Sequence, residues 1–410
     1  MEVQVGQSLH PSPEPVSLTA PPLTIPTARA PTDRPALWRK KLPEAVWAQA
    51  RPTVARREEG GIGNDARAAG ECRLPARFVG RRTQPLTFVP VVSHVSVVSN
   101  AGGLSVPTTV KAPPARVEPA PTGLLARVGA FVALTKPRII ELLLITTVPT
   151  MVVAADGWPS TKVLVVTLVG GTLSAGGANA ANMYLDRDID AVMRRTAHRP
   201  LVTGAVSPRA ALAFAATLEA MAFLSLWLMV NFLSAALALS AALFYVFVYT
   251  AVLKRLSPQN IVIGGAAGAV PVLVGWAAVR GSLGWAPLAL FALVFLWTPP
   301  HFWALAIRYR EDYAKAKVPM MPVVRSIERT SRQILAYSVA TIGASVAFGL
   351  LAHMHWVYWS VAVLAGAAFV GLCAKLVFSP RAALAMKVFH WSITYLSLLF
   401  VAMALDVVVH

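Results

Sequence analysis

Charged residues are scarce in this chain. They make up 14% of its 410 residues, whereas hydrophobic residues make up 56%. A soluble globular domain carries about 25% charged residues, so the composition argues against an ordinary soluble domain and favours an integral membrane protein. Cysteine is scarcer still, because Cys72 and Cys373 are the only two. They lie far apart without metal-ligand spacing, which gives no support to a disulfide framework or a zinc site.

Acidic residues are also few. There are 19 Asp and Glu against 37 Lys and Arg, and the formal net charge is +18. A basic excess of this kind can indicate nucleic-acid binding. Here, however, the cations of the second half lie in short loops between apolar segments, where membrane topology already explains them. We therefore expect no nucleic-acid partner.

Residues 1–120 lack any apolar periodicity, and more than half of the 31 prolines lie in them. This composition predicts a disordered N-terminal extension. No apolar segment follows Met1 closely, which argues against a bacterial signal peptide. A mitochondrial transit peptide fits poorly with Glu2, Glu14 and the dense prolines. A linker and a start site assigned too far upstream both stay open, although no second methionine precedes Met151.

Residues 121–410 contain almost all the long apolar runs and predict an all-α membrane domain. Each run approaches the roughly 20 residues that cross a lipid bilayer as a helix. Nine transmembrane helices are expected, at 138–155, 163–185, 209–229, 232–252, 261–279, 285–306, 333–353, 356–377 and 388–408.

The loops between these spans differ sharply in basic charge. The loops after the second, fourth, sixth and eighth spans hold nearly all the Lys and Arg, whereas the others hold only Lys162 and Arg280 at their edges. By the positive-inside rule, the N-terminus and the basic loops are predicted to face the cytoplasm, and His410 the other side. The expected location is the cell inner membrane, with the mitochondrial inner membrane as the alternative.

A polar cluster closes the second span at its cytoplasmic end. Asn182, Asp186 and Asp190 recur every four residues and share one face of a helix, with Asn179 about one turn earlier. Two carboxylates so close repel each other unless a cation lies between them, and Mg²⁺ commonly bridges carboxylates to substrate phosphates. A solvated acidic helix end is the alternative interpretation. Acids and amides at a membrane boundary favour the functional one.

Arginines follow this acidic cluster directly. Arg194, Arg195 and Arg199 come next in the sequence, and Lys254 and Arg255 lie on the next cytoplasmic loop. Positive-inside anchoring could account for them. Guanidinium groups also clamp phosphates through paired donors, and acids followed by cations are what a metal–diphosphate site needs.

Two further segments carry candidate residues. In the loop after the sixth span, Glu311 and Asp312 could bind a second metal, although mixed charge in such a loop is ordinary. Within the sixth span, two prolines precede His301, which stands between aromatic residues that include Trp303. A lone histidine is usually structural, but a flat aromatic surface suits a macrocyclic acceptor. His353 and His355 are expected at the opposite membrane interface.

Taken together, these motifs resemble those of the UbiA-type intramembrane prenyltransferases. The resemblance covers about 133–410. It is carried by Leu134-Thr-Lys-Pro-Arg138, the Asn182, Asp186 and Asp190 motif, Met193-Arg-Arg-Thr196 with Arg199-Pro-Leu201, Tyr249-Thr with Leu253-Lys254-Arg255, Trp297-Thr-Pro-Pro-His-Phe-Trp-Ala-Leu305, and Asp312-Tyr313 through Pro322-Val-Val324. The string around His301 resembles the haem-modifying branch of that superfamily.

The resemblance implies nine helices around a central cavity, and farnesyl transfer from farnesyl diphosphate to a vinyl group of protohaem IX, with water addition, giving haem O. Mg²⁺ is the implied cofactor, and a haem A synthase is a candidate downstream partner. The second motif departs from the superfamily's paired aspartates, because Ala316 stands four residues after Asp312. The implied site residues are Asn182, Asp186, Asp190 and Asp312 for catalysis, the three aspartates also for metal, Lys136, Arg195, Arg199 and Lys254 for diphosphate, and Asn179, His301 and Trp303 for haem.

Two other functions stay open. One is prenylation of a quinone precursor, against which the string around His301 argues. The other is transport, because acids inside membrane spans can line a pathway. Glu219, in the middle of the third span, favours transport, whereas the collection of acids and arginines at one membrane face argues against a through-path.

Overall fold

Long apolar helices make up most of the structure. The computed structural model describes residues 123–410, so the predicted extension 1–120 lies outside the described residues. Within the described part, eight helices are long and apolar enough to cross a membrane. They are α4 (Thr161–Leu185), α7 (Pro208–Met229), the joined helix Phe232–Leu256, α10 (Asn260–Arg280), α11 (Trp285–Arg308), α14 (Ile327–Leu351), α15 (Trp356–Phe378) and α16 (Ala382–Val409).

The helix α3 (Pro137–Ala155) takes the place of the first predicted span. Its apolar part, Leu143–Ala155, is shorter than the other spans, because Arg138 and Glu141 occupy its first turns. The all-helical membrane fold is therefore confirmed, whereas the count of nine spans is not. The remaining eight predicted spans match the observed helices to within about a turn or two at each end.

The helix joined across Phe232–Leu256 is not α-helical throughout. It consists of α8 (Phe232–Leu243), the π-helix η1 (Phe244–Leu253) and the short α9 (Lys254–Leu256). The predicted fourth span covers this region, but its apolar sequence gave no indication of the wider helical turn.

Polar caps set several helix starts. Ser207 accepts a hydrogen bond from the backbone of Ala210 at the start of α7, and Ser326 does the same for α14. Asn231 caps α8 and also donates from Nδ2 to the Ala277 carbonyl of α10 at 2.8 Å. Serine and asparagine are preferred at these positions because their side chains satisfy free backbone N–H groups.

Helix α10 packs between α3 and α11, with α8 also against it. Glycines permit this close approach. A Cβ atom on Gly275 would lie 3.0 Å from the Thr147 carbonyl of α3, and one on Gly265 would lie 2.9 Å from the Thr298 side chain of α11. Small residues at such positions allow membrane helices to pack backbone to backbone. On the other side, α11 packs against α14 and α16.

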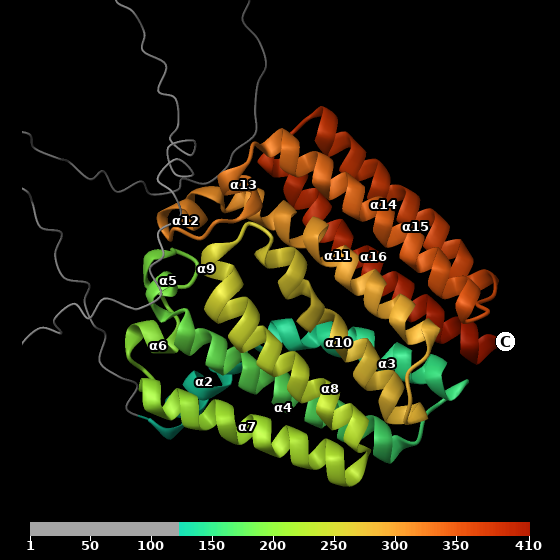
Figure 1. Ribbon diagram of the computed structural model, residues 1–410, viewed down its shortest axis with the longest axis horizontal. Helices are drawn as coiled ribbons and strands as arrows, with labels where there is room; N and C mark the ends of the chain where they lie inside the picture. The colour runs from blue at the N-terminus through green and yellow to red at the C-terminus, as the bar shows by residue number, and fades with distance from the viewer. Residues whose placement is uncertain (1–122) are drawn as a thin grey trace, which may run out of the picture. The chain divides into compact units, whose positions relative to one another are not determined.

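The short helices gather at one end of the bundle. Figure 1 shows α5 (Arg187–Val192), α6 (Pro200–Thr203), α9, α12 (Arg310–Lys315) and α13 (Met321–Val324) at this end, and the C-terminus at the other. Arg195 of the first basic loop lies over the ring of Tyr309 at the start of the third, 5.6 Å from its centroid. The two loops therefore lie on one side, as expected. Which side of the membrane that is stays a prediction.

Candidate active site

The acidic motif lies at the end of α4, at the end of the bundle where the short helices gather. Helix α4 ends at Leu185 and α5 begins at Arg187, so Asp186 is the residue between them. The helical hydrogen-bond pattern nevertheless continues, from Asp186 N to Asn182 O at 2.9 Å and from Asp190 N to Asp186 O at 2.8 Å. Asn182, Asp186 and Asp190 therefore keep the common face that their spacing predicts.

Asn182 is the centre of a hydrogen-bond network. Its Oδ1 accepts from Lys136 Nζ at 2.6 Å. Its Nδ2 donates both to Asp186 Oδ2 and to Thr250 Oγ1, each at 2.9 Å. These partners use both N–H donors of the amide and hold its plane in one orientation. Predicted metal and diphosphate residues are thus joined through one side chain.

Thr250 comes from the π-helix η1. Its hydroxyl donates to the Tyr245 carbonyl, five residues earlier, at 2.8 Å while accepting from Asn182. π-helical turns are rare and often occur at functional sites. Here the wider turn presents Thr250 to α4 and stacks Tyr245 on Tyr249, with ring centroids 5.4 Å apart. Thr250 belongs to the Tyr249-Thr motif, but its position in the sequence predicted no role for it.

Each buried aspartate has a basic partner. Lys254 Nζ lies 2.5 Å from Asp186 Oδ2, and Arg199 Nη1 lies 2.5 Å from Asp190 Oδ2. The two aspartates are 0% and 2% exposed. A carboxylate buried to this degree needs charged or hydrogen-bonding partners. The predicted acidic and basic residues therefore form two ion pairs, Lys254 with Asp186 and Arg199 with Asp190.

Arg255 binds the neighbouring Asp188 in a bidentate pair. Both N···O distances are 2.7 Å, and the same guanidinium donates to the Leu185 carbonyl at 2.7 Å. Partial burial opposes ionisation of Asp188, but the hydrogen bonds and charge of Arg255 outweigh it and lower the pKa of this carboxyl. This contact fastens the end of α4 to α9.

Lys136 stands between α2 (Leu124–Thr135) and α3 in a left-handed backbone conformation, with φ 54°. This conformation costs a non-glycine residue on the order of 1–3 kcal/mol and persists where the surroundings enforce it. Burial, followed by repulsion from Arg199 and Lys254, lowers the pKa of Lys136 to about 7. A pKa near 7 leaves Lys136 about half protonated at neutral pH, and a diphosphate bound beside it would favour the protonated form.

The aspartates also fit a divalent cation. Asp186 Oδ1 is buried and has no hydrogen-bond partner among the described residues, although Arg255 Nη2 lies 3.9 Å from it. Carboxylate oxygens are the ligands that Mg²⁺ prefers, and a buried charged oxygen without a hydrogen bond is costly. Asp186 and Asp190 are two of the three aspartates that the sequence predicted for the metal, and their role as ligands stays a prediction.

Other predicted residues lie at the edge of this network or outside it. Arg195 is exposed, and its guanidinium lies 5.6 Å from the ring centroid of Tyr309, between α11 and α12. Asp312 is half-buried on α12 and makes no side-chain hydrogen bond or ion pair within the described region. Asn179 donates to the Thr135 carbonyl at 3.0 Å, which ties α4 to α2. A second metal at Asp312 stays a prediction.

His301 is enclosed between α11 and α16. Its Nδ1 lies 2.8 Å from Ser392 Oγ, while Trp297 and Phe389 stack on its ring at centroid distances of 4.4 and 4.6 Å. Trp303 is 1% exposed, and its Nε1 has no hydrogen-bond partner in the described region. Because aromatic rings cover both faces of His301, a macrocycle could meet it only at the ring edge.

Glu219 of α7 has a local partner within the membrane-spanning region. Its Oε1 accepts from Ser174 Oγ of α4 at 3.0 Å. This contact joins the two helices that pack together most extensively.

Comparison with known proteins agrees with this geometry. A sequence model described as the UbiA prenyltransferase family matches residues 143–399. The chain belongs to the UbiA prenyltransferase family. A protoheme IX farnesyltransferase of Streptomyces avermitilis is 54% identical over 68% of this chain and 94% of that protein. Protoheme IX farnesyltransferase 1 of Saccharopolyspora erythraea is 55% identical over 69% of this chain and 90% of that protein.

Solved structures of low sequence identity share the UbiA fold. A digeranylgeranylglyceryl phosphate synthase superposes with a TM-score of 0.60 at 17% identity, over 69% of this chain and 99% of that one. A UbiA homologue from Aeropyrum pernix K1 gives a TM-score of 0.53 at 22% identity, over 65% of this chain and 98% of that one. The all-helical UbiA arrangement thus extends over the described bundle.

Proposed function

We propose that this chain transfers a farnesyl group from farnesyl diphosphate to a vinyl group of protohaem IX, with addition of water, to give haem O. The observation that carries the proposal is identity above 50% to proteins named protoheme IX farnesyltransferase, over more than nine-tenths of the Streptomyces avermitilis protein. The acid and cation network at the end of α4 supplies the matching chemistry.

The leaving diphosphate is the group that this network suits. Asp186 and Asp190 would hold Mg²⁺, which when bound neutralises part of the diphosphate charge. Lys254 and Arg199 already lie against these carboxylates. With Mg²⁺ bound to the carboxylates, the side chains of Lys254 and Arg199 would be free to donate to phosphate oxygens. Their charge then stabilises the diphosphate as its bond to the farnesyl carbon breaks.

Asn182 and Lys136 position this end of the site. The amide of Asn182 orients Asp186 through one N–H and is itself held by Thr250 and Lys136. Lys136, fixed by its strained backbone, adds a further cation to the diphosphate subsite. The haem vinyl group attacks the allylic cation that remains after ionisation, and water captures the resulting cation. The proton that this water loses passes to the released diphosphate or to bulk water. Arg195, in the loop after α5, and Asp312, on α12, would complete the diphosphate subsite.

The haem acceptor must be recognised outside the diphosphate subsite. His301 is the main candidate, through its ring edge, with Trp303 and Asn179 as further candidates. Ser392 Oγ donates to the Phe389 carbonyl and so accepts from Nδ1 of His301. The lone pair of the His301 ring is then on Nε2, which suits the haem iron. Prenylation of a quinone precursor is the second candidate function, because any member of the family needs the same diphosphate chemistry.

We further propose that the protein lies in the cell inner membrane with its N-terminus and basic loops in the cytoplasm, and that a haem A synthase consumes its product. The collection of Lys and Arg at the loop end of the bundle supports this orientation. Transport has less support, because Glu219 hydrogen-bonds Ser174 between α4 and α7.

The proposal is tested by the mass of haem extracted from cells with and without this chain. Cells that express it should accumulate haem with an added hydroxyethylfarnesyl group. Cells with the Asp186→Asn variant at equal membrane abundance serve as the control. If the hydroxyethylfarnesyl haem is absent from cells that express the intact protein, the proposal is contradicted.

A further inference from the structure

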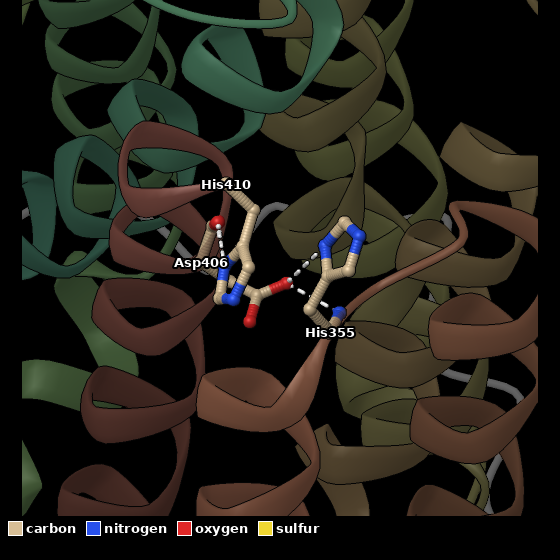
Figure 2. A group of neighbouring side chains, drawn as sticks. All are labelled: His355, Asp406 and His410. Atoms are coloured by element: carbon tan, nitrogen blue, oxygen red, sulfur yellow. Dashed lines mark hydrogen bonds and ion pairs between the residues drawn. The ribbon is translucent and has the colours of Figure 1, made fainter.

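A second cluster of chemistry-bearing side chains lies at the end of the bundle opposite the acidic motif. It consists of His355, just before α15, and Asp406 and His410 at the end of α16 (Figure 2). The C-terminus marks its position in Figure 1, far from α5 and α12. The proposed farnesyl transfer uses none of these residues.

Asp406 is the buried member of the cluster. It is 0% exposed, and backbone N–H groups hold both of its carboxylate oxygens. His355 N donates to Oδ2 at 2.6 Å and Tyr358 N donates to Oδ1 at 3.1 Å. The carboxylate therefore caps the first turn of α15. Each oxygen still has a free lone pair, so the cap does not use up its capacity as a ligand.

Figure 2 shows the rings of both histidines next to this carboxylate. His355 Nδ1 lies 3.5 Å from Asp406 Oδ2. The ring of His410 contacts the Asp406 backbone carbonyl through Nδ1 at 3.0 Å. Since a carbonyl can only accept, Nδ1 carries the proton and the lone pair of His410 is on Nε2. A backbone carbonyl that fixes the tautomer in this way is a typical partner of metal-binding histidines.

We propose that His355, Asp406 and His410 bind one divalent transition-metal ion of the zinc class. One ligand atom from each of the three residues lies within 4.8 Å of the others. Two imidazoles with one carboxylate form a nitrogen and oxygen donor set that zinc accepts, with water in the remaining position. Imidazole donors favour such an ion over Mg²⁺ or Ca²⁺, which prefer oxygen ligands.

Binding would require a small local movement. The two imidazole rings are stacked, with centroids 4.4 Å apart and planes 10° from parallel. A metal lies in the plane of each imidazole that ligates it, so a single ion cannot serve two parallel rings. Both histidines are exposed and free to turn toward Asp406. The bound ion would then link the start of α15 to the end of α16.

Equilibrium dialysis of the full-length protein against zinc tests the proposal. The protein should carry no polyhistidine tag, and excess Mg²⁺ should occupy the acidic motif. The intact protein is expected to bind one zinc ion. The His355→Ala and His410→Ala variants should bind zinc at least tenfold more weakly. His353→Ala is the matched control, because His353 is exposed in the same turn but lies outside the cluster. Its zinc binding should equal that of the intact protein.

Thermal unfolding gives a second measurement, since an ion that binds only the folded state raises Tm. Zinc should raise Tm in the intact protein and in His353→Ala, but not in His355→Ala or His410→Ala. Equal zinc binding in all four proteins, or equal loss in His353→Ala, would mean adventitious binding only and would overturn the proposal. Farnesyl transfer is measured separately, so either result stands apart from the proposed function.

Discussion

Thr250 offers a sharp test of the hydrogen-bond network, because one oxygen atom joins η1 to the acidic motif. Thr250→Val keeps the shape of the side chain and removes that oxygen. Asn182 then keeps Asp186 as the partner of one N–H, but the other N–H loses its acceptor at 2.9 Å. The Tyr245 carbonyl loses its donor at 2.8 Å as well.

The magnitude follows from the cost of an unpaired buried donor. Thr250 is 0% exposed, so water does not readily replace the lost hydroxyl. Leaving a buried donor unsatisfied costs about 1–3 kcal/mol. Asn182 can avoid this cost by turning to another acceptor, which would misplace Asp186. If transition-state stabilisation falls by the same amount, kcat/KM for farnesyl transfer should fall about 5- to 150-fold, at 1.36 kcal/mol for each factor of ten in rate. Thr250→Ser, which restores the oxygen, should recover most of the activity.

The assay compares kcat/KM for haem farnesylation across variants purified in equal amounts of folded protein. Thr341→Val is the matched control. Thr341 is also 0% exposed, and its hydroxyl likewise donates to a backbone carbonyl at 2.8 Å, but in α14. It should retain nearly full activity. Equal losses in both valine variants, or no loss in Thr250→Val, would refute the positioning role of Thr250.

Four other outcomes are expected. Asp186→Asn should abolish nearly all turnover without unfolding, and activity should vanish in excess chelator; full activity in chelator would exclude the metal–diphosphate mechanism. Single cysteines in the loops 186–208 and 307–332 should react with impermeant reagents from the cytoplasmic side only; labelling from opposite sides would contradict the topology. A chain that starts at Gly123 should insert and turn over normally, whereas loss of activity after correct insertion would give the extension a role. His301→Ala should impair transfer to haem while leaving farnesyl diphosphate affinity nearly unchanged; equal loss of both would remove its acceptor role.

Local patterns explain what the sequence could predict. The membrane spans follow from the length of apolar runs, and all but the first correspond to an observed long helix. Asn182, Asp186 and Asp190 share a face because a spacing of four residues matches the helical repeat. That geometry survives even though α4 ends at Leu185. Both inferences depend only on neighbours along the chain.

Other features depend on contacts that no local pattern encodes. The run from Phe244 to Leu253 is apolar apart from Thr250 and two tyrosines, and no pattern in it separates a π-helix from an α-helix. The surroundings of His301 come from Phe389 and Ser392 of α16, about ninety positions later in the chain. The string around His301 predicted a flat aromatic surface suited to a macrocycle, whereas in the structure Trp297 and Phe389 cover both faces of the His301 ring.

The most direct test of the central claim is the reaction of the purified protein with two acceptors in one mixture. Protohaem IX and 4-hydroxybenzoate are supplied at equal concentration with farnesyl diphosphate and Mg²⁺, and the products are identified by mass. The account predicts hydroxyethylfarnesyl haem and unchanged 4-hydroxybenzoate, with no product when chelator replaces Mg²⁺. Farnesylated 4-hydroxybenzoate beside unmodified haem would contradict it.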